Sequence, residues 1–151
     1  MLAPGDLAPP ISLLDHDGAA VTLASYAGRQ VLVFFYPKAS TPGCTQQACA
    51  LEAIRSDVGD VAILGISPDA PAKQKRFAVA QSLGFPLLAD TEHVVAQAYD
   101  VWQEKSMYGK TYMGIVRSAF LVDEKGTVRE AWYKVKPAAT ATNLLAALNK
   151  S

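Results

Sequence analysis

The sequence predicts an α/β protein in which helices flank a central mixed β-sheet. Residues 31–35 and 61–66 are runs of almost only apolar side chains, which is typical of strands buried on both faces. A stretch with helix-start residues and apolar side chains at helical spacing follows each run, as in β-α-β units. Turn-forming residues between short apolar runs indicate hairpins near both ends. The predicted order is a hairpin, strand–helix units, a second hairpin and a terminal helix.

The individual elements follow from apolar runs and from the residues that begin or end them. Strand-like runs at Ile11–Leu14 and Val21–Leu23 flank a turn at residues 15–18, which predicts an N-terminal β-hairpin. The other elements are expected at these positions: a helix from Pro42 to near Val58, a helix from Asp69 or Pro71 to about Leu83, a strand at Leu87–Leu88, a helix from Asp90 or Thr91 to about Tyr99, a loop over 102–114 with at most a strand fragment, strands Ser118–Val122 and Val128–Tyr133, and a helix after Pro137. No linker or repeat divides the chain, so residues 1–151 are expected to form a single domain.

The start of the first helix carries the strongest chemical signal. Thr41 is a good N-cap residue and Pro42 fits the first helical position, which makes Cys44 the third residue of the helix. There a thiol faces unpaired backbone N–H groups and the positive end of the helix dipole. This environment favours the thiolate, which is the nucleophilic form of cysteine. The sequence therefore predicts a reactive cysteine between a buried strand and a helix.

A second cysteine lies further along the same predicted helix. Cys49 follows Cys44 by five residues, which in an ideal helix corresponds to about 7.5 Å of rise and about 140° of rotation. The two Cα atoms would then be about 8–9 Å apart, whereas a disulfide requires about 7 Å or less. The pair can bond only if the first turns unwind. This spacing favours a working redox pair over a structural disulfide.

These residues resemble a known family. The pattern Pro37-x-x-x-Thr41-x-x-Cys44 resembles the peroxidatic motif of peroxiredoxins, and Thr-Pro-Gly-Cys-Thr followed by Ala48-Cys49 is similar to the bacterioferritin comigratory protein branch, also called PrxQ. Further stretches that agree with this branch are residues 5–9, 65–69, 85–90, 101–105, 109–110 and 117–123. The resemblance covers nearly the whole chain and implies a thioredoxin-like fold with Cys44 at the N-terminus of the helix after the central strand.

The resemblance also implies roles for five residues. Cys44 is expected to be the peroxidatic cysteine, and Cys49 the resolving cysteine that forms an intramolecular disulfide with it. Thr41 is expected to hydrogen-bond the thiolate and the peroxide, and Arg117 to hold the thiolate charge and orient the peroxide. Pro37 is expected to shield the thiolate from water. Without the resemblance, each of these residues has a simpler interpretation. Cys49 would have no chemical role and Thr41 would only cap the helix. Arg117 would be a solvated surface residue, and Pro37 would only end a strand.

Other residues receive weaker expectations. An apolar rim near Cys44 is conceivable from these side chains, although ordinary packing is as good an interpretation: Tyr36, Trp102, Met107, Tyr108 and Met113. Lys38 and Gln47 are expected to be solvated. Glu52 stands where many relatives carry a basic residue, which argues against a second cation near the site. A zinc site from the two cysteines with His16 and His93 is disfavoured by the C-x4-C spacing.

The implied activity is a thiol peroxidase that reduces hydrogen peroxide and organic hydroperoxides, with thioredoxin as reductant and without metal, haem or flavin. A monomer is implied, because the chain ends at its terminal helix without the extension that carries the resolving cysteine in obligate dimers. A general thiol–disulfide oxidoreductase is one alternative, although its usual motif is C-x-x-C. A peroxide sensor that binds a partner after oxidation is another.

Composition excludes several classes of partner. The chain has 14 basic and 14 acidic residues, so it lacks the charge excess that binds nucleic acid or an acidic membrane surface. No stretch is long and apolar enough for a transmembrane helix, and the first residues do not resemble a secretory signal. A cytoplasmic location is therefore expected, where paired cysteines are more often catalytic than structural.

Overall fold

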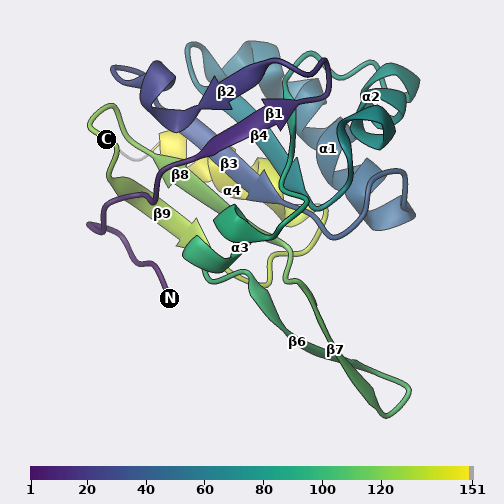
Figure 1. Cartoon of the computed structure of the whole chain (residues 1–151). Helices are drawn as coiled ribbons and strands as arrows, with labels where there is room; N and C mark the ends of the chain where they lie inside the picture. Colours follow the sequence, from purple (N-terminus) through teal and green to yellow (C-terminus); the bar gives the residue numbers. More distant parts are fainter. Residues whose placement is uncertain (150–151) are drawn as a thin grey trace.

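The computed structural model describes residues 1–149, and it confirms the α/β architecture (Figure 1). The main sheet has seven strands in the order β2-β1-β5-β4-β3-β8-β9. Its strands are β1 (Ser12–Asp15), β2 (Ala20–Thr22), β3 (Val31–Phe35), β4 (Ala62–Ser67), β5 (Leu87–Ala89), β8 (Ser118–Val122) and β9 (Val128–Trp132). The helices are α1 (Pro42–Ile54), α2 (Pro71–Ala80), α3 (Val94–Ala98) and α4 (Ala139–Leu148), with short 3-10 turns at η1 (Leu23–Tyr26) and η2 (Arg55–Val58).

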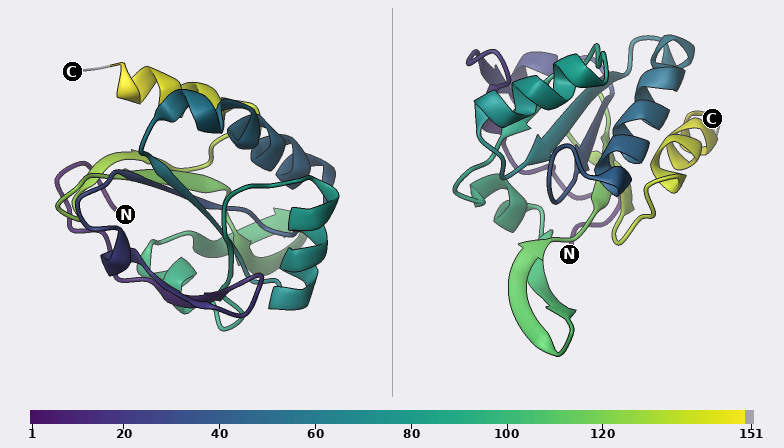
Figure 2. Two further views of the ribbon diagram at one scale, coloured as in Figure 1. Left: turned by 90° about the horizontal axis from the view of Figure 1, so that it is seen from above. Right: turned by 90° about the vertical axis from the view of Figure 1, so that its right-hand side faces the viewer.

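Strand β3 is the centre of the sheet. It pairs in parallel with β4 and antiparallel with β8, and all five of its side chains are buried. Because side chains alternate along a strand, Leu32 and Phe34 join the core cluster under α1, α2 and α4, whereas Val33 and Phe35 join the cluster that contains α3. Figure 2 shows α1 and α4 side by side over one face of the sheet. The loop after β3 therefore leads from the carboxyl end of the central strand into α1, on the face of the sheet that α1 and α4 cover.

The segment 102–114 differs from its prediction as a loop. It forms a two-stranded antiparallel hairpin, β6 (Trp102–Met107) and β7 (Lys110–Ile115), that extends away from the main sheet (Figure 1). Tyr108 and Gly109 form its two-residue turn with φ values of 52° and 77°, as a type I′ hairpin turn requires. Most side chains between Glu104 and Met113 are exposed, so the hairpin has no buried face. The apolar–polar alternation that announces a half-buried strand is therefore absent from this sequence.

Other boundaries shift by a few residues. Helix α1 ends at Ile54 and continues as η2, so the predicted end before Gly59 applies to the two elements together. Helix α3 begins only at Val94, but the predicted cap Asp90 still accepts hydrogen bonds from the N–H groups of Val95 and Ala96, at 3.2 and 2.8 Å. The 3-10 turn η1 was not expected. Within residues 1–149, no helix has the length and apolar character needed to cross a bilayer.

The pKa values of two buried tyrosines determine how the free energy of unfolding should change at alkaline pH. The Tyr99 hydroxyl donates to the Pro9 carbonyl at 2.8 Å, and the Tyr36 hydroxyl donates to Gln74 Oε1. Burial raises the pKa of both phenols above the ordinary value of 10.0. The unfolded chain therefore loses these protons first, and their contribution to stability is complete below pH 10.0 and declines above it.

We expect the wild-type free energy of unfolding to fall more steeply with pH above about 10 than that of Tyr99→Phe. Urea unfolding of the two proteins at several pH values from about 9 to about 11.5 measures both slopes. Equal slopes would mean that the Tyr99 phenol ionises as easily in the folded protein as in the unfolded chain.

Candidate active site

Cys44 occupies the helix position that the sequence predicts. Thr41 is the N-cap residue, with extended backbone angles (φ −90°, ψ 157°), and Pro42 is the first residue of α1. Cys44 follows in the first turn, and only 1% of its surface is exposed. The thiol is thus held among the unpaired N–H groups of the helix start and is shielded from bulk water.

Arg117 is the cationic group that contacts this thiol. Its Nη2 lies 3.5 Å from Cys44 Sγ, although the two residues are 73 positions apart in the sequence. Arg117 directly precedes β8, and the last pair of the β3–β8 ladder is Phe35–Ser118, so sheet pairing brings Arg117 to the start of α1. A side chain on Gly43 would meet Nη2 at 3.0 Å. The glycine therefore lets the guanidinium approach the thiol closely.

Gln47 also belongs to the site, and its predicted solvation is wrong. Its side chain is completely buried. Its Oε1 accepts a hydrogen bond from Arg117 Nη1 at 2.7 Å, and its Nε2 donates to Thr140 Oγ1 at 2.9 Å. The buried amide loses little free energy on leaving water, because both its oxygen and its nitrogen have hydrogen-bond partners. The sequence contained one unused signal: Gln47 is three residues after Cys44, so the two side chains share one helix face.

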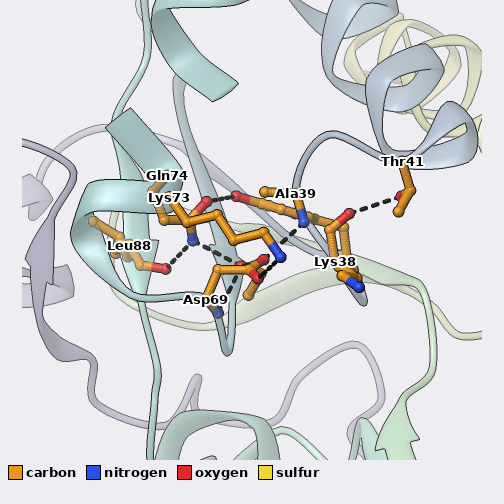
Figure 3. A network of polar contacts seen from close by, with 9 residues as sticks. Lys38, Ala39, Thr41, Asp69, Lys73, Gln74 and Leu88 are labelled. Atoms are coloured by element: carbon orange, nitrogen blue, oxygen red, sulfur yellow. Dashed lines mark hydrogen bonds and ion pairs between the residues drawn. The ribbon is translucent and has the colours of Figure 1, made fainter. Parts of the chain in front are cut away.

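Thr41 does not make the expected side-chain cap. Its hydroxyl donates instead to the Lys38 carbonyl at 2.7 Å (Figure 3), and the helix start has no side-chain cap hydrogen bond. A hydroxyl that donates in this way still has lone pairs with which to accept a hydrogen bond. Pro37 is half-buried at the start of this loop, and Lys38 is exposed as expected.

A polar network anchors the loop between β3 and α1 (Figure 3). The Asp69 carboxylate accepts hydrogen bonds from the Ala39 N–H and the Ser67 hydroxyl, both at 2.7 Å, and pairs with Lys73 Nζ at 3.1 Å. The same loop contains Ser40 with a φ of 65°, a conformation that non-glycine residues rarely adopt. Asp69 thus fixes the backbone that precedes α1. It does not cap α2 as its position in the sequence suggested, because the N-cap residue of α2 is Ala70, without a side-chain cap hydrogen bond.

Buried amide chemistry extends this network toward the core. Gln74 accepts from the Tyr36 hydroxyl and donates from Nε2 to the Ser67 hydroxyl at 2.8 Å and the Leu88 carbonyl at 3.0 Å. Burial raises the pKa of the Tyr36 hydroxyl, and the hydrogen bonds with Ser67 and Gln74 only partly oppose this shift, so the hydroxyl stays protonated at neutral pH. The network therefore joins the end of β3 to β4, α2 and β5.

Cys49 lies on the same uninterrupted helix as Cys44, and both are free thiols. Cys49 is partly exposed, and its Sγ donates to Gln81 Oε1 at 3.4 Å. Glu52, one turn further on, accepts hydrogen bonds from the Gly84 N–H at 2.7 Å and from Arg55 Nε at 3.1 Å. The far half of α1 is thus tied to the loop before β5, while the segment that separates the two cysteines is a regular helix.

The base of the β6–β7 hairpin approaches the site through Lys105. Its Nζ donates to the Ile115 carbonyl at 2.9 Å. Burial lowers the pKa of Lys105, the charge of Arg117 lowers it further, and Cys44 opposes the shift. Lys105 is therefore a second cationic side chain within electrostatic range of the thiol. The expectation from Glu52 that no second cation lies near the site is thus wrong, because the hairpin and not α1 supplies one.

The five side chains considered for an apolar rim near Cys44 do not lie together around it. Tyr36 belongs to the same core cluster as Cys44, but Trp102 packs against the cluster on the other face of the sheet and stacks on His93 with 3.8 Å between ring centroids. The remaining members, Met107, Tyr108 and Met113, are 55%, 97% and 49% exposed on the projecting hairpin. The other histidine, His16, accepts a hydrogen bond from the Leu87 N–H at 3.2 Å.

Known proteins resemble this chain in sequence. Residues 4–131 match the model of the AhpC/TSA family. The chain is 51% identical over 140 residues to a putative peroxiredoxin of Mycobacterium tuberculosis, covering 89% of this chain and 87% of the relative. It is 48% identical over 133 residues to peroxiredoxin Bcp of Escherichia coli, covering 87% and 85% of the two chains.

Solved structures agree with the sequence comparison. Peroxiredoxin Q from Xanthomonas campestris has a TM-score of 0.86 at 41% identity, with 91% of this chain and 89% of that chain covered. A cysteine-to-serine mutant of PrxQ from Xylella fastidiosa has a TM-score of 0.90 at 28% identity, with 98% and 96% covered. These likenesses confirm the thioredoxin-like fold. With its family match, its Bcp relatives and a helix-start cysteine beside an arginine, the chain belongs to the AhpC/TSA family, in the Bcp/PrxQ branch of the peroxiredoxins, and is a peroxidase.

Proposed function

We propose that Cys44 is the peroxidatic cysteine and that Arg117 activates it. The observation that carries this proposal is the 3.5 Å contact between Arg117 Nη2 and Cys44 Sγ at the start of α1. The Cys44 thiolate attacks one oxygen of a hydroperoxide, forming an S–O bond as the O–O bond breaks. The thiolate becomes a sulfenic acid, and the leaving oxygen takes up a proton to give an alcohol or water.

Arg117, Thr41 and Pro37 support this displacement. The guanidinium stabilises the thiolate and the negative charge that develops on the peroxide oxygens. The Thr41 hydroxyl, oriented by its bond to the Lys38 carbonyl, accepts a hydrogen bond from the peroxide O–H. Pro37, half-buried at the loop start, limits the access of water to the sulfur. The substrates are hydrogen peroxide and organic hydroperoxides; the bacterioferritin comigratory protein of Xanthomonas campestris is described by its alkyl peroxide reduction activity.

Cys49 resolves the sulfenic acid. Its thiol attacks Cys44 Sγ, the S–O bond breaks, and water leaves as the intramolecular disulfide forms. The uninterrupted helix between the two cysteines must unwind for this step. A dithiol protein of the thioredoxin type then reduces the disulfide by exchange. Because both sulfurs are in one chain, the cycle requires no second copy, and we propose a monomer that acts in the cytoplasm.

Burial distinguishes this function from general thiol–disulfide exchange. Cys44 is 1% exposed, so a small hydroperoxide reaches its sulfur far more easily than a disulfide within a folded protein does. A general oxidoreductase would need the opposite arrangement, with an accessible attacking sulfur.

Arg117→Met tests the proposed activation. Loss of one charged donor at the reacting centre is expected to lower the second-order rate constant for hydrogen peroxide by about 10²- to 10³-fold. The rate constant of Arg117→Lys should lie between those of the wild type and Arg117→Met, because lysine keeps the positive charge but lacks the planar guanidinium group. Stopped-flow consumption of hydrogen peroxide measures all three proteins.

The matched control is Arg76→Met, which removes an exposed arginine of α2. It should react like the wild type. If Arg117→Met also did so, the contact with Cys44 would have no part in activation.

A further inference from the structure

The start of α4 lies against the active site. The Val135 N–H, just before α4, donates to the Arg117 carbonyl at 2.9 Å. A side chain on Gly43 would meet Pro137 at 3.5 Å as well as Arg117. Thr140, in the first turn of α4, is completely buried and accepts the hydrogen bond from Gln47. Figure 2 shows α4 lying along α1. Residues 135–140 therefore flank the start of α1 and contact Arg117, Gly43 and Gln47.

The hydrogen-bond types in this contact fix the Gln47 amide. An arginine side chain can only donate, so the Gln47 carbonyl oxygen must face Arg117. The NH₂ group then points toward α4, where it requires an acceptor. The Thr140 hydroxyl supplies one at 2.9 Å. A threonine hydroxyl can both donate and accept, whereas a valine of the same shape could do neither.

Gln47 also lies between the two cysteines on the same helix. When residues 44–49 unwind to form the disulfide, Gln47 must leave Arg117 and Thr140. The two hydrogen bonds therefore belong to the wound helix, which reacts with peroxide, and they oppose the unwound segment, which forms the disulfide. Their strength sets the balance between the two steps of the cycle.

We propose that Thr140 is a positioning residue for the peroxidase reaction: its hydroxyl holds the Gln47 amide so that Arg117 faces Cys44, and this contact breaks when the helix unwinds. Thr140 acts through Gln47 and Arg117 and does not touch the reacting atoms. The inference rests on the roles proposed above for Cys44, Arg117 and Cys49.

Thr140→Val tests the proposal, because it preserves the shape of the side chain and removes the acceptor. Leaving the buried N–H without a partner should slow the reaction with hydrogen peroxide by about tenfold and speed disulfide formation from the sulfenic acid by a similar factor. Stopped-flow peroxide consumption gives the first rate. Quenching with an alkylating agent followed by intact-mass analysis gives the second.

A pH profile separates positioning from general loosening. Both proteins compared here carry Cys49→Ser, and one of them also carries Thr140→Val. The rate at which iodoacetamide alkylates Cys44 should begin to rise at a higher pH in the protein with Thr140→Val, because Arg117 is less well held against the sulfur. Thr140→Ser keeps the hydroxyl and should restore the wild-type rates and profile. It also provides the comparison if the valine variant folds poorly.

The control is Thr142→Val, which removes the exposed threonine one residue beyond Ala141 on the same helix and should change neither rate. Three results would overturn the proposal: wild-type rates in Thr140→Val, equal losses in the valine and serine variants, or the same losses in Thr142→Val. These results leave the catalytic assignments intact. Peroxide consumption by Cys44→Ser, in contrast, would remove the proposed function itself.

Discussion

Replacing Cys44 with serine is expected to reduce hydroperoxide consumption to the uncatalysed background, a loss of about 10⁴-fold or more. A serine hydroxyl does not ionise at neutral pH, so neither the helix start nor Arg117 has an anion to stabilise. The substitution is close to isosteric in a site that is 1% exposed, and the fold should tolerate it. Stopped-flow measurement of hydrogen peroxide loss, with circular dichroism to verify folding, provides the test.

The control for this loss is the other cysteine. Cys49→Ser retains the nucleophile and should consume one equivalent of hydroperoxide in a single turnover, with one sulfenic acid per chain trapped by dimedone. If a folded Cys44→Ser protein consumed peroxide as the wild type does, the nucleophile would have to be assigned elsewhere.

Cys49→Ser should lose steady-state turnover with thioredoxin even though its first turnover is normal. The sulfenic acid at Cys44 then has no second sulfur within its own chain, since the sequence contains only two cysteines. We expect a fall of about 10²-fold or more in the rate of NADPH oxidation in an assay coupled through thioredoxin and its reductase, because a substitute thiol must come from solution and loses the advantage of proximity.

The first turnover of the same sample is the internal control for this prediction, because it verifies that the peroxide step survives. Full turnover of Cys49→Ser with thioredoxin would exclude Cys49 as the resolving cysteine. The thioredoxin arm also tests the reductant: a wild-type protein that turned over only with a different dithiol protein would correct that proposal while leaving the resolving step in place.

The local features of the site could be predicted from the sequence. Thr41 and Pro42 predict where the helix starts, and α1 does begin at Pro42 with Thr41 as its N-cap residue, although the Thr41 hydroxyl makes no cap hydrogen bond. The separation of Cys44 from Cys49 follows from helix geometry alone. Such inferences succeed because the interactions that determine them span only a few residues.

Long-range partners could not be predicted in this way. The Arg117–Cys44 contact depends on the pairing of β8 with β3, and only the family resemblance indicated it. Gln47 reads as a polar surface residue until α4 supplies Thr140, which is 93 positions away. The residue pattern within α1 does not predict that a neighbouring helix buries the Gln47 side chain.

The projecting hairpin was missed for a different reason. Strand prediction depends on one face being buried, but the side chains between Glu104 and Met113 are mostly exposed on both faces of β6 and β7. The strands are held together by backbone pairing and by a turn at Tyr108 and Gly109 with two positive φ values. Only the turn is recognisable in the sequence, and Tyr-Gly is a weaker indicator of a two-residue hairpin turn than Asn-Gly or Asp-Gly.

In the proposed cycle, peroxide converts Cys44 and Cys49 into one intramolecular disulfide through unwinding of the helix that separates them. Intact-mass analysis of the reduced protein after one equivalent of hydrogen peroxide tests it directly. We expect a loss of two hydrogen atoms per chain and, after proteolysis, a peptide pair joined through Cys44 and Cys49. A persistent gain of one oxygen at Cys44, or a disulfide that joins two chains, would contradict it.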